Sequence, residues 1–204
     1  MPLSRLSRQL QSCAVTERAE SAPPLFNMGI TIHYRFMVKD RDAVLQVLKN
    51  TKEMAVKLGM KILEDKETSL VIHPHKDSET INLEFRKWNE VKAIKEWNYC
   101  KETMIDYEKV VSDNDFVCSS FTKTQYAGLK IHVLVAEILR KVAGRCTLAY
   151  VDDEADYYET GNIQKTAENF DASSKMISKM AGMLKEAFGS ENVYCSIDNL
   201  SDTK

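Results

Sequence analysis

The chain has 204 residues, a formal net charge of −2 and 28% charged residues. This length supports one large domain or two small ones, and it is sufficient for a hydrophobic core. Basic and acidic residues are mixed along the whole chain, so no basic stripe is present for a nucleic acid backbone to follow. No apolar run approaches the roughly 20 residues that span a bilayer. We therefore expect neither a nucleic acid nor a membrane as a partner.

The five cysteines are odd in number and widely spaced, and no C-x-x-C pair occurs. This spacing argues against a zinc site built on thiolates and against a disulfide framework. We expect free cysteines and a cytoplasmic location.

Residues 1–27 differ in composition from the remainder of the chain. Their first half contains Arg5 and Arg8 but no acidic residue, and Pro23-Pro24 interrupts any helix that precedes it. We expect a disordered or non-native extension, with a targeting peptide, a tag or a mis-assigned start as the alternatives. Residues 28–204 then form a single domain.

The first predicted element is a strand over 30–38, where apolar and polar residues alternate at period two. Asp40 is a suitable N-cap for a helix over 44–58, whose apolar residues recur at helical spacing. Gly59 follows this helix in the position that a C-terminal glycine favours.

Short strands are predicted over 61–63 and 69–73, followed by a turn and a strand over 80–86. Pro74 cannot donate to a sheet ladder, so it marks the end of the strand that precedes it. The last two of these strands are expected to form a hairpin. The charged stretch 88–114 predicts one or two surface helices.

The second half of the chain predicts, in order, a strand over 116–125, a buried helix over 131–142, a strand over 147–151, a helix over 171–188 and an edge strand over 193–197. Helices and hairpins in one chain indicate an α+β fold, with a mixed, largely antiparallel sheet and helices packed mainly on one face. The strand-helix-strand order in each half is compatible with an internal duplication, but the identity between the halves is too low to claim one.

His73-Pro74-His75 contains two of the four histidines of the chain. Imidazoles two residues apart on an extended chain point to the same side, and Glu79 follows shortly after. Two imidazoles and a carboxylate suit a divalent first-row metal, so we predict His73, His75 and Glu79 as metal ligands. The alternative is a hairpin turn with two solvated histidines.

Polar residues gather where the strand over 116–125 ends and the next helix begins. Free backbone N–H groups at such a junction attract anions, Lys123 adds a positive charge, and Gln125 and Tyr126 add hydrogen-bonding groups. Histidine is the residue type suited to proton transfer near neutral pH, so His132 in the helix is the candidate general base, with Lys123 as its catalytic partner. The alternative is a capping cluster in which His132 is a core histidine.

Two further groups are weaker candidates. His33 and Arg35 share the more polar face of the first strand, where they are placed to bind a carboxylate or phosphate. A surface ion pair with a neighbouring acid is the alternative. The acidic run 152–154, with Glu159, is suited to a hard cation, but a solvated loop is the favoured interpretation because the calcium-loop spacing is absent.

Four motifs together resemble an uncharacterised family of small prokaryotic proteins: GITIHYRF at 29–36, HPHKDSE at 73–79, FTKTQYAG at 121–128 with His132, and YETG at 158–161. Phe36 stands where that family has glycine. The resemblance covers residues 28–161 and implies kinship and a shared site region. It implies no reaction, because the family has no assigned activity.

These features predict a polar pocket on the sheet that holds a small anionic molecule or a divalent metal, with hydrolysis as its reaction if the protein is an enzyme. The predicted walls are His33, Arg35, Lys123, Gln125 and His132, with His73 and His75 at the rim. The alternative is a non-catalytic binding or assembly module. It would form homo-oligomers through the methionine-rich stripe of its C-terminal helix.

Overall fold

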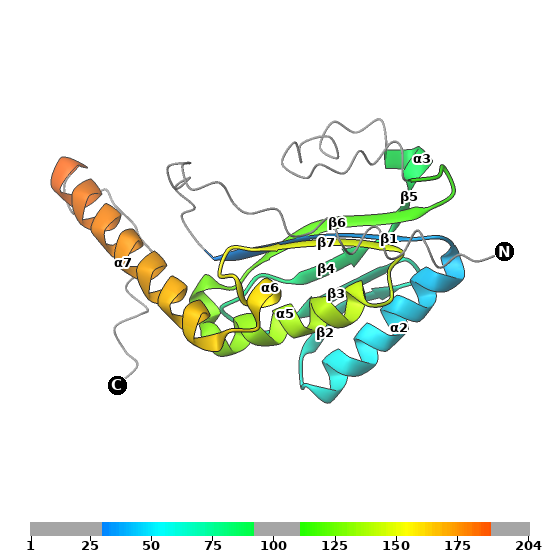
Figure 1. Ribbon diagram of the computed structural model, residues 1–204, viewed down its shortest axis with the longest axis horizontal. Helices are drawn as coiled ribbons and strands as arrows, with labels where there is room; N and C mark the ends of the chain where they lie inside the picture. The colour runs from blue at the N-terminus through cyan, green and yellow to red at the C-terminus, as the bar shows by residue number, and fades with distance from the viewer. Residues whose placement is uncertain (1–29, 92–110, 189–204) are drawn as a thin grey trace.

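The computed structural model describes residues 30–91 and 111–188 (Figure 1). Helices packed with antiparallel sheets confirm the predicted α+β class. The strands are β1 (Thr31–Val38), β2 (Lys61–Lys66), β3 (Ser69–His73), β4 (Ile81–Glu84), β5 (Arg86–Lys87), β6 (Phe116–Lys123) and β7 (Leu148–Asp153). The helices are α2 (Arg41–Lys57), α3 (Trp88–Val91), α5 (Leu129–Ala143), α6 (Tyr157–Thr160) and α7 (Ile163–Phe188), with a short 3-10 helix η2 (Gln125–Ala127).

The strands form two sheets rather than the single sheet that the sequence predicted. Sheet A has the strand order β5-β6-β1-β7, and sheet B has the order β2-β3-β4. Helices α2 and α5 lie on the same side of sheet A as sheet B, so one main core is enclosed between them (Figure 1). We call this side of sheet A the inner face and the opposite side the outer face.

Strand β1 has buried side chains on both faces of sheet A. Its even-numbered residues from Ile32 to Val38 are buried in the main core, as the period-two pattern predicted. The outer face was predicted to be polar, yet Met37 is also buried there, against Trp88 of α3 and Val117 of β6. Among the described residues, the outer face therefore has an apolar half around Met37 and a polar half around His33, whose side chain is half exposed.

The local signals at the helix ends are confirmed. The side chain of Asp40 accepts a hydrogen bond of 2.8 Å from the backbone N–H of Ala43 and caps α2. Gly59 and Gly128 have φ angles of +73° and +80°, which disfavour side chains, and they mark the end of α2 and the start of α5.

A continuous segment from Glu79 to Lys87 runs antiparallel beside β6 and is attached to it at both ends. At one end the backbone N–H of Glu79 donates to the carbonyl of Lys123 at 2.9 Å. At the other end β5 pairs with β6 through Arg86 and Val117. Between these points β4 pairs with β3 instead, so the segment passes from sheet B to sheet A.

Side chains of the inner face bridge the opening between β4 and β6. The hydroxyl of Tyr34 accepts a hydrogen bond of 2.9 Å from the backbone N–H of Asn82. The hydroxyl of Thr122 donates to the carbonyl of Thr80 at 3.0 Å, and the thiol of Cys118 donates to the carbonyl of Asn82. Burial raises the pKa of Tyr34 to about 12. Three buried side chains thus replace part of a backbone ladder, which is why two sheets form instead of one.

Other boundaries differ from the sequence predictions. Helix α7 begins at Ile163 instead of near Asp171, because the side chain of Asn162 accepts a hydrogen bond from the backbone N–H of Lys165. Strand β7 extends to Asp153, two residues beyond its predicted end. The predicted extension 1–27, the greater part of the helical stretch 88–114 and the edge strand 193–197 lie outside the described residues. No helix in the described ranges has the length and apolar character needed to cross a membrane.

We expect Tyr34→Phe to lower the free energy of unfolding by about 1–3 kcal/mol, because the buried N–H of Asn82 then loses its acceptor. Urea denaturation at neutral pH measures this loss. Tyr126→Phe is the matched control, since Tyr126 is exposed, and its effect should stay within about 0.5 kcal/mol. Equal effects of the two variants would show that the bridge to β4 contributes nothing.

Candidate functional site

The sequence motifs that lie far apart in the chain meet at one end of sheet A. The backbone N–H of Thr124, after β6, donates to the carbonyl of Ile30 at 3.0 Å. The backbone N–H of Thr31 donates to the carboxylate of Glu154 at 2.8 Å. Glu79, at the end of the HPHKDSE motif, contacts Lys123 through both its backbone and its side chain. This end is therefore the candidate site region.

A buried chain of hydrogen bonds connects three elements beneath the inner face. The hydroxyl of Thr124 lies 2.8 Å from His132 Nδ1, and His132 Nε2 lies 3.0 Å from Asp153 Oδ1. The carboxylate can only accept, so Nε2 donates to it, and in the neutral imidazole Nδ1 then accepts from the threonine hydroxyl. The end of β6, helix α5 and the end of β7 are joined in this way.

The carboxylate of Asp153 also organises the chain that follows β7. The backbone N–H groups of Ala155 and Tyr158 each donate to it at 2.9 Å. Burial by itself raises the pKa of Asp153, but its hydrogen bond and attraction to His132, together with these two backbone donors, outweigh burial and lower the pKa. The solvated acidic loop predicted for this stretch is wrong for Asp153, which is 3% exposed.

This cluster is closed to solvent. Thr124 and His132 are both 0% exposed, and the ring of Phe170 in α7 packs edge-on against His132 at a centroid distance of 5.1 Å. A general base must reach its substrate within hydrogen-bond distance, and His132 as placed here has no such access. The structure therefore favours the alternative interpretation, in which His132 is a core histidine with both ring nitrogens bonded.

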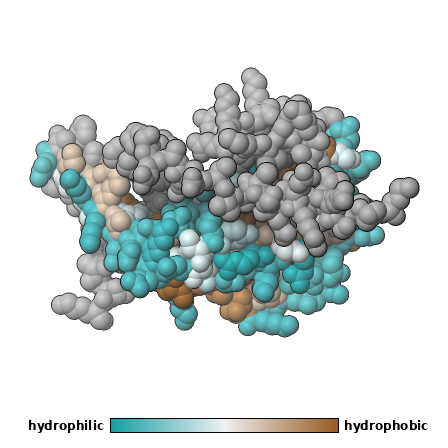
Figure 2. All heavy atoms as spheres, in the orientation of Figure 1, coloured by the Kyte–Doolittle hydropathy of each residue, from teal (hydrophilic) through white to brown (hydrophobic). Residues whose placement is uncertain are grey.

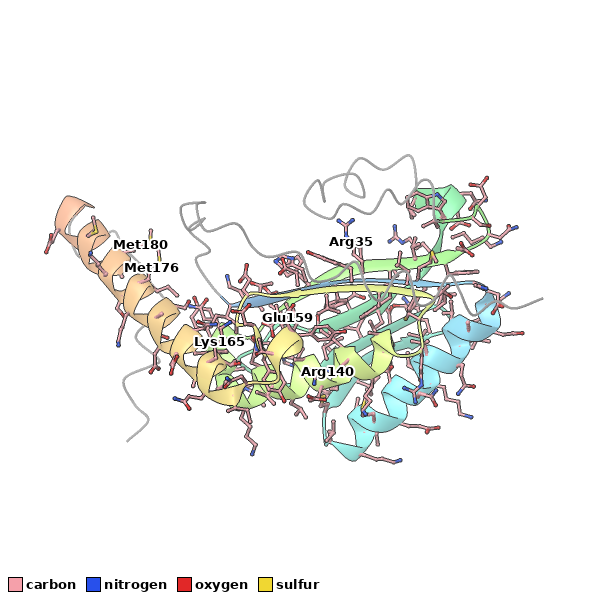
Figure 3. All side chains as sticks on the ribbon, viewed as in Figure 1. Arg35, Arg140, Glu159, Lys165, Met176 and Met180 are labelled. Atoms are coloured by element: carbon pink, nitrogen blue, oxygen red, sulfur yellow. The ribbon has the colours of Figure 1, made fainter. Side chains whose placement is uncertain are left out.

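The segment with the YETG motif is fixed against α5 by Arg140 (Figure 3). The guanidinium of Arg140 donates to the carbonyl of Tyr158 at 2.7 Å and lies over the rings of Tyr157 and Tyr158 at 5.5 and 5.3 Å. Burial raises the pKa of Glu159 in the same short helix. Through the backbone N–H of Tyr158, helix α6 is also hydrogen-bonded to Asp153 of the buried cluster.

The outer face of sheet A has a different set of functional groups. In the strand register His33 lies between Phe121 of β6 and Asp152 of β7, and Arg35 lies between Ser119 and Tyr150. Figure 3 shows Arg35 pointing away from α2 and α5. These side chains are separated from His132 by the sheet itself, so the expected common pocket of His33, Arg35 and His132 does not form.

His33 is the accessible imidazole of this region. Its side chain is 50% exposed, its Nε2 lies 3.8 Å from Glu154 Oε1, and its ring lies 5.8 Å from that of Phe121. The 3.8 Å separation is an ion-pair contact, longer than a hydrogen bond. The interaction with Glu154 raises the pKa of His33, although burial and the charge of Arg35 oppose this. The sequence proposed His33 as a ligand contact, and the structure leaves it available for that role.

The predicted metal ligands are not brought together. His73 ends β3 opposite Lys61 of β2, whereas His75 sits in the following turn, where its Nδ1 accepts from the backbone N–H of Asp77 at 3.2 Å. The carboxylate of Glu79 accepts instead from the backbone N–H of Lys123. In the stretches 30–91 and 111–188 no three His, Cys, Asp or Glu side chains are grouped to hold a metal ion. The hairpin-turn alternative fits this geometry.

Gln125 and Tyr126 follow Thr124 in the short helix η2. Tyr126 is exposed, whereas Oε1 of Gln125 is buried and has no hydrogen-bond donor among the residues that the structure describes. A buried polar atom of this kind calls for a partner, such as a water molecule or a ligand. Of the predicted ligand contacts near the end of β6, Gln125 is therefore the one with an unmet hydrogen-bonding requirement.

Sequence reasoning gave Thr124 no role of its own, considered Glu154 only as part of the acidic run 152–154, and assigned Asp153 to the wrong environment. A signal for Asp153 was present in the sequence. The period-two pattern of the last strand continues past Val151, which places Asp153 on the same face as Val151, toward the core. No local pattern indicated that its partner would be His132.

Comparison of the chain with protein families, with curated proteins and with solved structures gave no match.

We expect Asp153→Asn to reduce the free energy of unfolding by about 1–3 kcal/mol at neutral pH, because it weakens a buried hydrogen-bonded network. The folded-state pKa of Asp153 is lowered, so its contribution is complete above the unfolded pKa of about 3.9 and is lost as the pH falls through the folded value. The difference between wild type and variant should therefore shrink in acid.

Urea denaturation at a series of pH values measures this difference. Asp152→Asn is the control, because Asp152 is the adjacent carboxylate on the exposed side of β7. Equal free energies of unfolding for the wild type and Asp153→Asn at neutral pH would contradict the role assigned to Asp153.

Proposed function

We propose that the protein binds a small anionic molecule on the polar half of the outer face of sheet A, and that His33 exchanges a proton with it. The observation that carries this proposal is a half-exposed imidazole with a raised pKa, which lies beside Glu154 and diagonally across the strand register from Lys123. Buried His132 is excluded from this role by its position. His33 takes the role that the sequence assigned to His132.

The strand register supports a shared ligand for His33 and Lys123. Lys123 lies opposite Thr31, and His33 lies opposite Phe121, so the two cationic side chains occupy diagonal positions on one face. Diagonal neighbours in an antiparallel pair are about 7–8 Å apart, which long side chains can bridge through one small anion. The exposed ring of Phe121 supplies an apolar surface beside them.

The charges around His33 make the proposed binding depend on pH. Arg35 and Lys123 contribute two positive charges to this end of the face, and Asp152 and Glu154 contribute two negative charges. The carboxylate of Glu79, which accepts a hydrogen bond from the backbone N–H of Lys123, adds a third negative charge. The group therefore carries one net negative charge when His33 is neutral and no net charge when His33 is protonated. Anion binding should therefore strengthen as the pH falls through the raised pKa of His33.

We expect sulfate, whose own charge is constant over this range, to bind more tightly at about pH 6 than at about pH 8, because protonated His33 adds a positive charge. His33→Gln should abolish this pH dependence, and Lys123→Gln should weaken binding by about fivefold at either pH. NMR titration, followed at the backbone amides of β1 and β6, measures both effects. Lys130→Gln, an exposed lysine at the start of α5, is the control. Binding that is unchanged in His33→Gln and Lys123→Gln would refute the proposal.

A second function, assembly of copies through α7, is favoured by the position of this helix. Helix α7 extends well beyond the two sheets, and Met176 and Met180 lie on one of its sides (Figures 1 and 3). Met183 follows on the same side and is 60% exposed. A methionine-rich helix surface adapts readily to a partner surface.

If copies assemble through α7, Met183→Glu should shift the protein to a smaller species in size-exclusion chromatography with light scattering. The substitution places a charge in an apolar contact, whereas the protein should remain folded because Met183 is exposed. Ser178→Glu, on the opposite side of α7, should leave the size unchanged. A wild type that is monomeric throughout the accessible concentration range would end this second proposal.

A further inference from the structure

A groove of about 410 Å³ lies between the last turns of α2 and α5, on the side of the molecule away from the outer face of sheet A. This volume is within the range of small-molecule sites, about 300–1,000 Å³. Its lining residues are Asn50, Thr51, Glu53, Met54, Lys57, Leu58, Lys141 and Arg145. We call it the α2–α5 groove.

Three cations line the α2–α5 groove. Lys57 comes from the last turn of α2, Lys141 from the last turn of α5, and Arg145 from the chain directly after α5. The guanidinium of Arg145 donates to the backbone carbonyl of Lys141 at 2.9 Å, which fixes it at the groove. Against these three positive charges, the lining residues include one acid, Glu53, so the groove has a net charge of +2.

Two cations of α2 that lie outside the groove are paired with acids. Lys52 forms an ion pair with Asp65, and Arg41 forms one with Glu67. Within the part of the chain that the structure describes, the ammonium groups of Lys57 and Lys141 form no ion pair with an acid. Basic residues in the last turn stabilise a helix through its macrodipole, which explains their presence but not their place along one groove.

The groove also has an apolar wall. Met54 and Leu58 of α2 line it, and Leu58 is 46% exposed. Figure 2 shows hydrophobic residues at the lower edge of the molecule, near the point where α2 ends in Figure 1. Exposed apolar side chains beside unpaired cations match a ligand that has both a charged and an apolar part.

We infer that the α2–α5 groove binds a small amphipathic anion, namely a carboxylate or phosphate monoester that carries a short aliphatic or aromatic group. Lys57, Lys141 and Arg145 contact the anionic head, and Met54 and Leu58 contact the apolar part. Asn50, which also lines the groove, provides an amide for hydrogen bonding. This site is independent of the proposed site at His33, because the two lie on opposite sides of sheet A.

Isothermal titration calorimetry with hexanoate and hexyl phosphate tests this inference, with hexanol and inorganic phosphate as partial ligands. Both amphipathic anions should bind, and each should bind about fivefold or more tighter than either partial ligand. Equal binding of hexanol would show that the cations do not contribute. Equal binding of inorganic phosphate would show that the apolar wall does not contribute. Either result would overturn the inference, as would the absence of binding.

Single substitutions test whether hexanoate binds in the α2–α5 groove. Lys141→Gln and Arg145→Gln should each weaken hexanoate binding by about fivefold, whereas Lys52→Gln, a paired lysine of α2, should not. Thermal unfolding followed by circular dichroism confirms that each variant is folded. Lys123→Gln should leave hexanoate binding unchanged, which separates this site from the one at His33. Loss of binding in Lys123→Gln, with none in Lys141→Gln or Arg145→Gln, would assign the ligand to the other face.

Discussion

The carboxylate of Asp153 is the constraint on which the site region depends. It accepts hydrogen bonds from the side chain of His132 and from the backbone of Ala155 and Tyr158, all within a buried environment. A buried carboxylate is costly unless its oxygens are satisfied, and here both oxygens have donors. The same contacts set the position of α5 relative to β7 and the path of the chain into α6.

The position of Asp153 also determines the geometry of the outer face of sheet A. Glu154 follows Asp153 directly, so once Asp153 is held beneath the sheet, the carboxylate of Glu154 reaches the backbone of Thr31 and the imidazole of His33. Strand alternation places Asp152 on the opposite side from Asp153. Three consecutive acids therefore have three roles: one faces outward beside His33, one is buried with His132, and one joins the two strands at their ends.

The bridge from Tyr34 to β4 explains how one molecule offers two separate surfaces. Because side chains rather than a backbone ladder join β4 to β6, sheet B lies beneath sheet A and encloses the core with α2 and α5. The helices end on the far side of that core, where the α2–α5 groove forms. The two proposed ligand sites are thus separated by a layer of packed apolar side chains, and neither needs the other to be occupied.

The sequence by itself determined the local structure. Period-two and helical patterns predicted β1, α2, the hairpin of β3 and β4, and α5, and Asp40 and Gly59 marked the ends of α2. It also placed His33 and Arg35 on one face. These results follow because backbone preference and side-chain direction repeat over a few residues and are encoded where they act.

Tertiary structure alone decided which histidine is accessible and which is buried. His132 and Asp153 are 21 residues apart in the chain, and Tyr34 and Asn82 are 48 apart, so no local pattern records their contacts. Periodicity indicates which side chains share a face, but it does not indicate what covers that face. Packing of α5 and α7 buried His132, while the polar half of the outer face left His33 half exposed, because burial depends on the elements that pack together and not on the residue type.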